Sequence, residues 1–360
     1  MTVLHNFTLL VITVFFMRGT AQGYYYDKAY SSVSVRSRSR PGPVKTLTRC
    51  PGQYCGRQLI ETENETIWSA CGSCPRGSRV NGTWACIECP SSPSAYDWMY
   101  LAFMLLLGLL VQWYSIDSSQ HHPQTGSNNN NNLKFCFKVL CLHFSAFVET
   151  SLAAIITLLA NEPYGLFTLR SCPAQKLSDW YTLLHNPNPN YEETLHCAQE
   201  AVYPLYSLVF MHYGLSVLML LLIRPWVNKA LEIKGRAASM PIYAGLYLFP
   251  ALTLIHGTMA GLIYYSFPSI IILLSLMSHA FHFASRSDQS WRVLLQETVS
   301  SFHNLIVVLG HWILHGFGLV ALTMWLDAAL LATILTLVPV PTFLYVVFAR
   351  FTDPGKFHSD

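Results

Sequence analysis

The stretch DWMYLAFMLLLGLLVQWYSI, residues 97–116, decides the fold class of this chain. It runs for twenty residues with a single charged side chain, Asp97, at its start. A helix of about 20 apolar residues is long enough to cross the roughly 30 Å hydrocarbon core of a bilayer. Because backbone groups in lipid must find hydrogen bonds within their own segment, the stretch is predicted to be a transmembrane helix and not a strand.

Six further apolar stretches of similar length follow, at residues 137–160, 202–223, 241–265, 268–285, 302–325 and 328–349. Only 11% of the 360 residues are charged, against about 25% in soluble proteins. We therefore predict an all-α polytopic membrane protein, with about seven transmembrane helices over residues 96–350. The basic residues form no base-reading motif, so the expected environment is a lipid bilayer, with no nucleic acid as a partner.

The N-terminal region indicates export across a membrane. Residues 7–17 form an apolar run that is too short to span a bilayer. With the small residues Gly19 and Ala21 after it, the run fits a signal peptide over residues 1–21. Residues 22–49 are polar and basic, and they are expected to form a disordered linker.

Six of the ten cysteines lie within residues 50–95, which we call the head: Cys50, Cys55, Cys71, Cys74, Cys86 and Cys89. They could form three disulfides, whose pairing the spacing leaves open. Alternatively, four thiolates from the Cys-x2-Cys pairs could bind zinc. Glycosylation sequons at Asn64 and Asn81 favour an oxidising lumen, where disulfides persist. We therefore expect disulfides and two glycans, with no metal and no cofactor.

The placement of basic residues predicts the orientation in the membrane. Residues 117–136, 224–240, 286–301 and those after 349, with the flanking helix ends, hold ten Lys and Arg residues. The loops on the other side hold only Arg170 and Lys176. The positive-inside rule then places the N-terminus in the lumen and the C-terminus in the cytoplasm. The longest lumenal loop, residues 161–201, contains Cys172 and Cys197, which we expect to pair with each other.

Two histidines, His311 and His315, are the best candidates for chemistry inside the membrane, because they lie four apart on one helical face. With Glu149 or Asp327 they could form a proton relay or the zinc site of an intramembrane hydrolase. The alternative is that neutral histidines hydrogen-bond between helices. The pair is a weak motif and no nucleophile motif is present, so we predict no catalytic residues and no enzyme.

A seven-helix receptor with a ligand-binding head is a further possibility. Against it, no Asp-Arg-Tyr motif lies at the cytoplasmic end of the third predicted helix. The predicted cytoplasmic surface is too small for a catalytic domain but could dock a partner. The candidate docking segments are residues 224–240 and the tail, residues 351–360.

Several short motifs are distinctive: Tyr54-Cys55-Gly56, Cys71-Gly72-Ser73-Cys74-Pro75-Arg76-Gly77, Tyr96-Asp97-Trp98, Arg170-Ser171-Cys172 and His311-Trp312-Ile313-Leu314-His315. In these motifs the chain resembles the Jun-kinase-associated membrane protein family, over nearly everything after Cys50. The resemblance implies a multi-pass endoplasmic reticulum protein that is not an enzyme. It also implies a scaffold that recruits the proteasome and membrane ubiquitin ligases for degradation of misfolded proteins, and that binds a Jun kinase.

Overall fold

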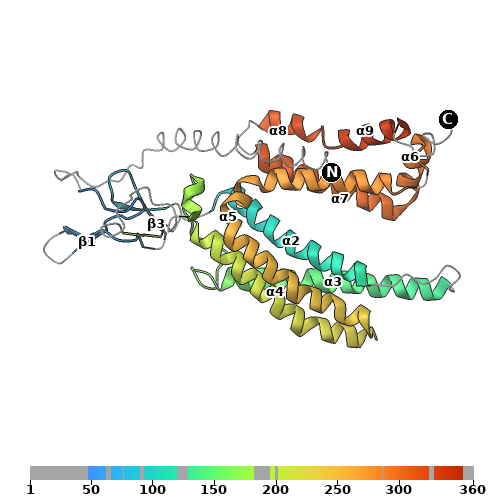
Figure 1. Ribbon diagram of the computed structural model, residues 1–360, viewed down its shortest axis with the longest axis horizontal. Coiled ribbons are helices and arrows are strands. Elements are labelled where there is room, and N and C mark those ends of the chain that lie inside the picture. Colours follow the sequence, from blue (N-terminus) through green and yellow to red (C-terminus); the bar gives the residue numbers. More distant parts are fainter. Residues whose placement is uncertain are drawn as a thin grey trace. The chain divides into compact units, whose positions relative to one another are not determined.

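The computed structural model describes residues 48–61, 66–75, 77–89, 93–119, 129–181, 195–198, 202–286, 288–323 and 328–351. The chain forms two compact units, Met1–Tyr264 and Tyr265–Asp360. Figure 1 shows the chain coloured from blue at the N-terminus to red at the C-terminus. The predicted signal peptide, residues 22–47 of the predicted linker and residues 352–360 of the predicted tail lie outside the described residues, as do Asn64 and Asp327.

The head consists of two short antiparallel hairpins. Strand β1 (Leu59–Glu61) pairs with β2 (Thr66–Trp68), and β3 (Ser78–Val80) pairs with β4 (Cys86–Glu88). Gly56 and Gly72 exchange two backbone hydrogen bonds of 2.9 and 3.0 Å beside the first hairpin. The strands bury little apolar surface, since Leu59 and Ile67 are 51% and 53% exposed. Covalent links must therefore supply much of the stability of the head.

The first unit also contains helices α2 (Ala95–Ser119), α3 (Asn129–Leu159) and α4 (Tyr203–Ala230), and the first part of α5 (Arg236–Ala284). Helices α2, α3 and α4 contact one another and run side by side in Figure 1. A short 3-10 helix, η1 (Leu177–Tyr181), lies in the long loop, residues 161–201. The turn from α4 to α5 uses Gly235 with a φ of 65°, a conformation that glycine adopts without strain.

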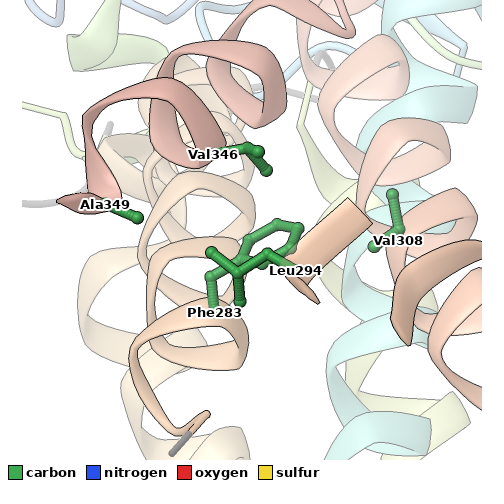
Figure 2. Packing of buried hydrophobic residues seen from close by; sticks show 5 residues of the cluster. All are labelled: Phe283, Leu294, Val308, Val346 and Ala349. Atoms are coloured by element: carbon green, nitrogen blue, oxygen red, sulfur yellow. The ribbon is translucent and has the colours of Figure 1, made fainter. Parts of the chain in front are cut away.

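The second unit contains the end of α5 with α6 (Trp291–Ser300), α7 (Phe302–Thr323), α8 (Ala328–Leu335), α9 (Val340–Phe348) and η2 (Ala349–Phe351). Its core is a cluster of buried side chains, one from each of five elements, shown in Figure 2: Phe283, Leu294, Val308, Val346 and Ala349. Trp312 Nε1 donates to Thr342 Oγ1 at 2.7 Å and ties α7 to α9. Residues 286–301, expected as a connecting segment, thus contain a helix that packs on this core.

Among the described residues, six helical segments are long and apolar enough to cross a membrane. They include α2, α3, α4 and α7, and residues 329–348, where α8 and α9 meet near Pro339. The sixth is α5, whose 49 residues cover two of the expected stretches, 241–265 and 268–285. A single span needs about 20 residues, so α5 has the length of two. The predicted class, a helical polytopic membrane protein with a disulfide-rich N-terminal region, is confirmed.

Candidate functional site

Four disulfides hold the head together and fasten the long loop to it. Two lie within the head, Cys50–Cys71 and Cys74–Cys86. The other two join the head to the loop, Cys55–Cys197 and Cys89–Cys172, with Cα separations of 5.3 and 5.0 Å. The expected bond between the two loop cysteines is therefore wrong. The expectation that the six head cysteines pair only with one another is also wrong.

This pairing arises because the long loop packs directly against the head. Arg79 on β3 donates from Nη1 to Pro173 O at 3.1 Å and from Nη2 to Gln175 Oε1 at 2.7 Å. At the other junction, a Cβ on Gly52 would collide with the carbonyl oxygen of Leu195. The head and loop backbones therefore approach closely at both places, which brings their cysteines within bonding reach.

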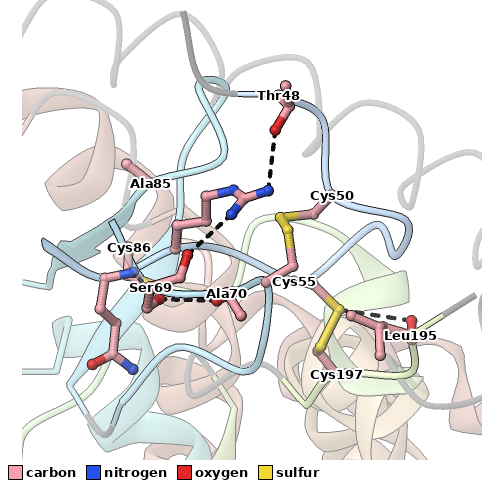
Figure 3. Close-up of a disulfide and its surroundings, with 12 residues drawn as sticks. Thr48, Cys50, Cys55, Ser69, Ala70, Ala85, Cys86, Leu195 and Cys197 are labelled. Carbon is pink, nitrogen blue, oxygen red and sulfur yellow. Dashed lines mark hydrogen bonds between the residues drawn. A yellow bond between two sulfur atoms is a disulfide. The ribbon is translucent and has the colours of Figure 1, made fainter. Parts of the chain in front are cut away.

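Arg57 strengthens the head beside the junction drawn in Figure 3. Its Nη1 donates to Ser69 O at 3.0 Å and its Nη2 donates to Thr48 Oγ1 at 3.1 Å. Nearby, Tyr54 is only 8% exposed. Burial raises the pKa of Tyr54 above that of a free tyrosine, so its hydroxyl stays neutral at physiological pH.

The sequon at Asn81 lies in the turn between β3 and β4. Asn81 Oδ1 accepts hydrogen bonds from Thr83 N, Thr83 Oγ1 and Ala85 N at 2.9, 2.7 and 3.0 Å. Gly82 and Thr83 are exposed, as a glycosylation acceptor requires. Glycosylation at Asn81 stays a prediction.

The long loop also inserts an aromatic side chain among the helices of the first unit. Trp180, on η1, is 6% exposed, and its ring centroid lies 5.9 Å from that of Tyr100 and 5.0 Å from that of Tyr264. Asp179 Oδ2 fixes the turn before it by accepting from the backbone N–H groups of residues 175 and 176 at 2.8 and 3.1 Å. A Cβ on Gly261 would lie 2.8 Å from Trp180 Cβ, so the indole occupies space that only glycine leaves free.

The Tyr96-Asp97 motif ties α2 to α5 at the same end of the unit. Tyr264 donates its hydroxyl to Asp97 Oδ1 at 2.5 Å, and Tyr96 donates its hydroxyl to Tyr264 O at 2.8 Å. Asp97 Oδ2 also accepts from Ser94 N at 2.8 Å, at the start of α2. The motif is thus explained by helix packing, and its carboxylate is fully engaged.

A buried ion pair joins three helices farther along the bundle. Arg224 on α4 donates from Nε and Nη2 to the two carboxylate oxygens of Glu149 on α3, both at 2.9 Å. Gln112 on α2 accepts from Arg224 Nη2 at 3.1 Å, and Ser145 donates to Glu149 Oε1 at 2.7 Å. Arg224 and Glu149 are 1% and 0% exposed. Arg224, the first residue of the expected cytoplasmic segment 224–240, thus lies within α4 and is buried in this pair.

The two predicted histidines lie in the second unit, on α7 beside the end of α5. The rings of His311 and His279 have centroids 5.2 Å apart, and Ser278 Oγ lies 3.4 Å from His311 Nε2. His315 is 9% exposed. Within the described ranges, no group of three or more His, Cys, Asp or Glu side chains is arranged to hold a metal ion. Glu149 is paired with Arg224, and the zinc-hydrolase hypothesis gains nothing from these positions.

Of the predicted docking segments, residues 224–240 form the end of α4, a short turn and the start of α5. Without Arg224, the basic groups that remain exposed there are Lys229, Lys234 and Arg236. We call these three residues the basic turn. Tail residues 352–360 lie outside the described residues.

The buried ion pair and the links between head and loop are the functional features that the sequence analysis missed. A signal for the first was present, because an isolated carboxylate inside an apolar stretch needs a partner of opposite charge. Arg224 directly follows the apolar stretch 202–223, close enough for the same helix to carry it. No comparable signal distinguishes one cysteine pairing from another.

Comparison with known proteins identifies the family of this chain. The family model described as JNK1/MAPK8-associated membrane protein matches residues 50–354. The human protein of that name is 38% identical over 315 residues, which cover 86% of this chain and 96% of the human one. A Caenorhabditis elegans homolog is 29% identical over 328 residues, or 88% and 97% of the two chains. No solved structure matches this chain.

The family match begins at Cys50, the first disulfide cysteine, and covers both units. It therefore includes all eight bonded cysteines, the buried ion pair and the basic turn. The resemblance seen in the short motifs is confirmed, and the chain belongs to the JNK1/MAPK8-associated membrane protein family.

Proposed function

We propose that this protein is a scaffold of the endoplasmic reticulum membrane that binds a Jun kinase and has no enzymatic activity of its own. It recruits proteasome and ubiquitin-ligase components to the membrane, where misfolded proteins are degraded. Family membership supports the kinase part, since the human and mouse relatives are named for association with JNK1/MAPK8. The candidate membrane spans support residence in a bilayer.

The observation that carries the proposal is the basic turn. Lys229, Lys234 and Arg236 are exposed around residues 231–235, at the opposite end of α4 from the disulfide-linked loop. The charge distribution supports a cytoplasmic position for this end: without Arg224, nine basic residues belong to the segments expected on that side, against two in the loops expected on the other. A small basic surface suits docking of an acidic patch on a soluble partner, because charge complementarity speeds and orients association.

The test measures binding of purified Jun kinase to the full chain in lipid nanodiscs. Replacing Lys229, Lys234 and Arg236 by Ala should lower kinase capture at least about fivefold and flatten its dependence on salt. The matched control replaces Arg170 and Lys176, which are exposed on the long loop. Undiminished capture by the triple variant, or equal loss in the control, would contradict docking at the basic turn.

The degradation role has a separate test. The full chain is captured from cells in mild detergent, with and without folding stress, and its partners are identified by mass spectrometry. Proteasome subunits and membrane ubiquitin ligases should be enriched in the stressed sample. Their absence from both samples would remove the recruitment proposal, whatever the kinase result.

A further inference from the structure

A polar cavity of about 300 Å³ lies in the first unit, where the head and the long loop meet the ends of α3 and α4. Its wall contains Gly77 of the head, residues between 160 and 170 just after α3, and residues between 203 and 211 in the first turns of α4. Both helices are candidate membrane spans, and the cavity lies where one ends and the other begins. Its position is therefore the boundary of the bilayer, the depth at which phospholipid headgroups lie.

The links between head and loop hold the wall of this cavity in place. Gly77 O accepts from Cys89 N at 2.7 Å, and Cys89 is bonded to Cys172, two residues after Arg170. Leu169, which precedes Arg170, is 2% exposed and anchors the loop at this point. The head part and the loop part of the wall are thus fixed to each other before any ligand binds, which lowers the ordering cost of binding.

The wall offers a positive charge and hydrogen-bond donors. Arg170 is exposed, and its guanidinium forms no ion pair or hydrogen bond with another described residue. Tyr203 and Ser207 are half-buried, and within the described ranges their hydroxyls likewise have no partner. Neither oxygen is enclosed by protein, so a ligand in the cavity can reach both. A guanidinium with two hydroxyls matches a phosphate diester, whose oxygens only accept.

The same wall also offers acceptors. Asn161 donates from Nδ2 to Thr157 O at 3.3 Å, which leaves its Oδ1 as an acceptor with no donor among the described residues. Glu162 adds a carboxylate, whose Oε1 lies 3.4 Å from the hydroxyl of Tyr164. These oxygens suit a primary ammonium group, which carries three donors. The carboxylate also disfavours a ligand with several negative charges.

The size and the surroundings of the cavity indicate which molecule supplies these groups. A cavity of about 150 Å³ holds benzene, so twice that volume can hold a headgroup of roughly ten heavy atoms. Beside the cavity the loop exposes Tyr164, Leu166 and Phe167 by 70%, 54% and 61%. Exposed aromatic side chains just beyond the end of a span are typical of the bilayer interface. This loop therefore offers an apolar surface to the acyl chains of a bound lipid.

We propose that this cavity binds the phosphoethanolamine headgroup of a membrane phospholipid. Arg170 and the hydroxyls of Tyr203 and Ser207 hold the phosphate, and Asn161 and Glu162 hold the ammonium group. A soluble phosphoethanolamine ester has the same chemistry, but the position of the cavity at the span ends favours the lipid. Binding here does not depend on the scaffold role, because the basic turn lies at the other end of α4.

The experiment measures lipid binding to the full chain by native mass spectrometry. The protein is delipidated in a mild detergent, treated with endoglycosidase, and titrated separately with phosphatidylethanolamine, phosphatidylcholine and soluble phosphoethanolamine. Phosphatidylethanolamine should occupy one saturable site at least about fivefold more tightly than phosphatidylcholine, whose quaternary ammonium has no N–H to donate. Soluble phosphoethanolamine should bind at least about tenfold more weakly, because it lacks the acyl chains.

Two variants test the site, each with a matched control. Arg170→Gln should weaken binding of phosphatidylethanolamine about tenfold, the order expected for one charge-assisted hydrogen bond. Its control is Lys176→Gln, which removes a charge from an exposed position of the same loop outside the wall. Ser207→Phe fills the cavity and should abolish the saturable site. Its control is Leu218→Phe, at an exposed position of α4 outside the wall.

The proposal is overturned if Arg170→Gln, which changes only an exposed side chain and leaves the core intact, binds phosphatidylethanolamine like the parent chain. It is also overturned if Lys176→Gln loses as much binding, since the effect would then be one of general charge. Equal affinity for the two lipids would show that the acceptors in the wall play no part and would refute recognition of the ammonium group. Equal affinity for the lipid and for soluble phosphoethanolamine would refute the lipid and assign the site to a soluble ester.

Discussion

The buried pair of Arg224 and Glu149 predicts an asymmetric response to mutation. The two side chains form two hydrogen bonds of 2.9 Å across the α3–α4 interface, with almost no exposure. Removing one partner of such a pair leaves an uncompensated buried charge and costs about 3–5 kcal/mol. Glu149→Met should lie at the upper end of this range, because the stranded guanidinium cannot lose its proton. Arg224→Met should cost less, because a proton can neutralise the stranded carboxylate.

Replacing both residues by Met should restore most of the lost stability, since no unpaired charge remains. Apolar side chains of similar volume often replace a buried ion pair at little or no cost. A residual loss of about 1–3 kcal/mol is expected from Gln112, whose Oε1 accepts from Arg224 in the parent chain. The double variant should therefore be more stable than either single variant.

The assay is unfolding of the full chain in mixed micelles of a mild detergent and increasing SDS, followed by tryptophan fluorescence. Lys229→Met is the control, because Lys229 lies exposed on the same helix and should change the free energy of unfolding by less than about 0.5 kcal/mol. The reasoning fails if both single variants behave like the control. It also fails if the loss in the double variant equals the sum of the two single losses, since the residues would then act independently.

Three further predictions follow from the first unit. A protease site inserted within residues 120–128 lets the chain be cut between α2 and α3. Both head-to-loop disulfides bridge this cut, so the two fragments should separate on gels only after reduction. Separation without reduction would contradict that pairing. Gly261→Ala should lower the free energy of unfolding in the SDS assay by about 1–3 kcal/mol, because the added methyl group crowds Trp180. Gly214 has open space around it, so Gly214→Ala should be neutral or stabilising. Equal effects of the two substitutions would refute the close packing at Gly261. Asn81→Gln should remove one glycan, so the variant should migrate faster on a gel than the parent chain. Endoglycosidase treatment of the parent chain should produce the same shift. An unchanged band would show that Asn81 is not glycosylated.

The sequence is sufficient to predict the membrane-spanning part of the fold. Each apolar stretch is long enough to be assigned by itself, without knowledge of its neighbours. The break before Pro268 was assigned as a boundary between two helices, yet α5 is continuous through it. Proline removes one backbone donor, and a helix can continue where neighbouring groups compensate for that loss. Helix number is thus less certain from the sequence than helix content.

The site depends on contacts between distant residues, and these are harder to predict. Cys55 and Cys197 are 142 residues apart, and their bond depends on how the long loop packs on the head. The short spacing between the two loop cysteines favoured a local bond that the structure does not contain. Arg224 was counted with the loop residues, because a count of charges near span ends does not distinguish an exposed loop side chain from one that is buried within a helix. Its neighbours Leu221 and Leu222 are exposed on the surface of the protein, but the helical turn directs Arg224 inward to Glu149.

The disulfides between head and loop impose an order on biosynthesis. Cys55 leaves the ribosome 142 residues before Cys197, a delay of roughly 7–28 s at 5–20 residues per second. During that interval the thiol of Cys55 has no native partner, and Cys89 waits 83 residues for Cys172, although other head cysteines lie close by. Oxidative folding of the head can finish only after α3 and the long loop have been made, because the loop supplies Cys172 and Cys197. We therefore expect newly made protein to need thiol–disulfide exchange wherever early mispairing occurs in the head.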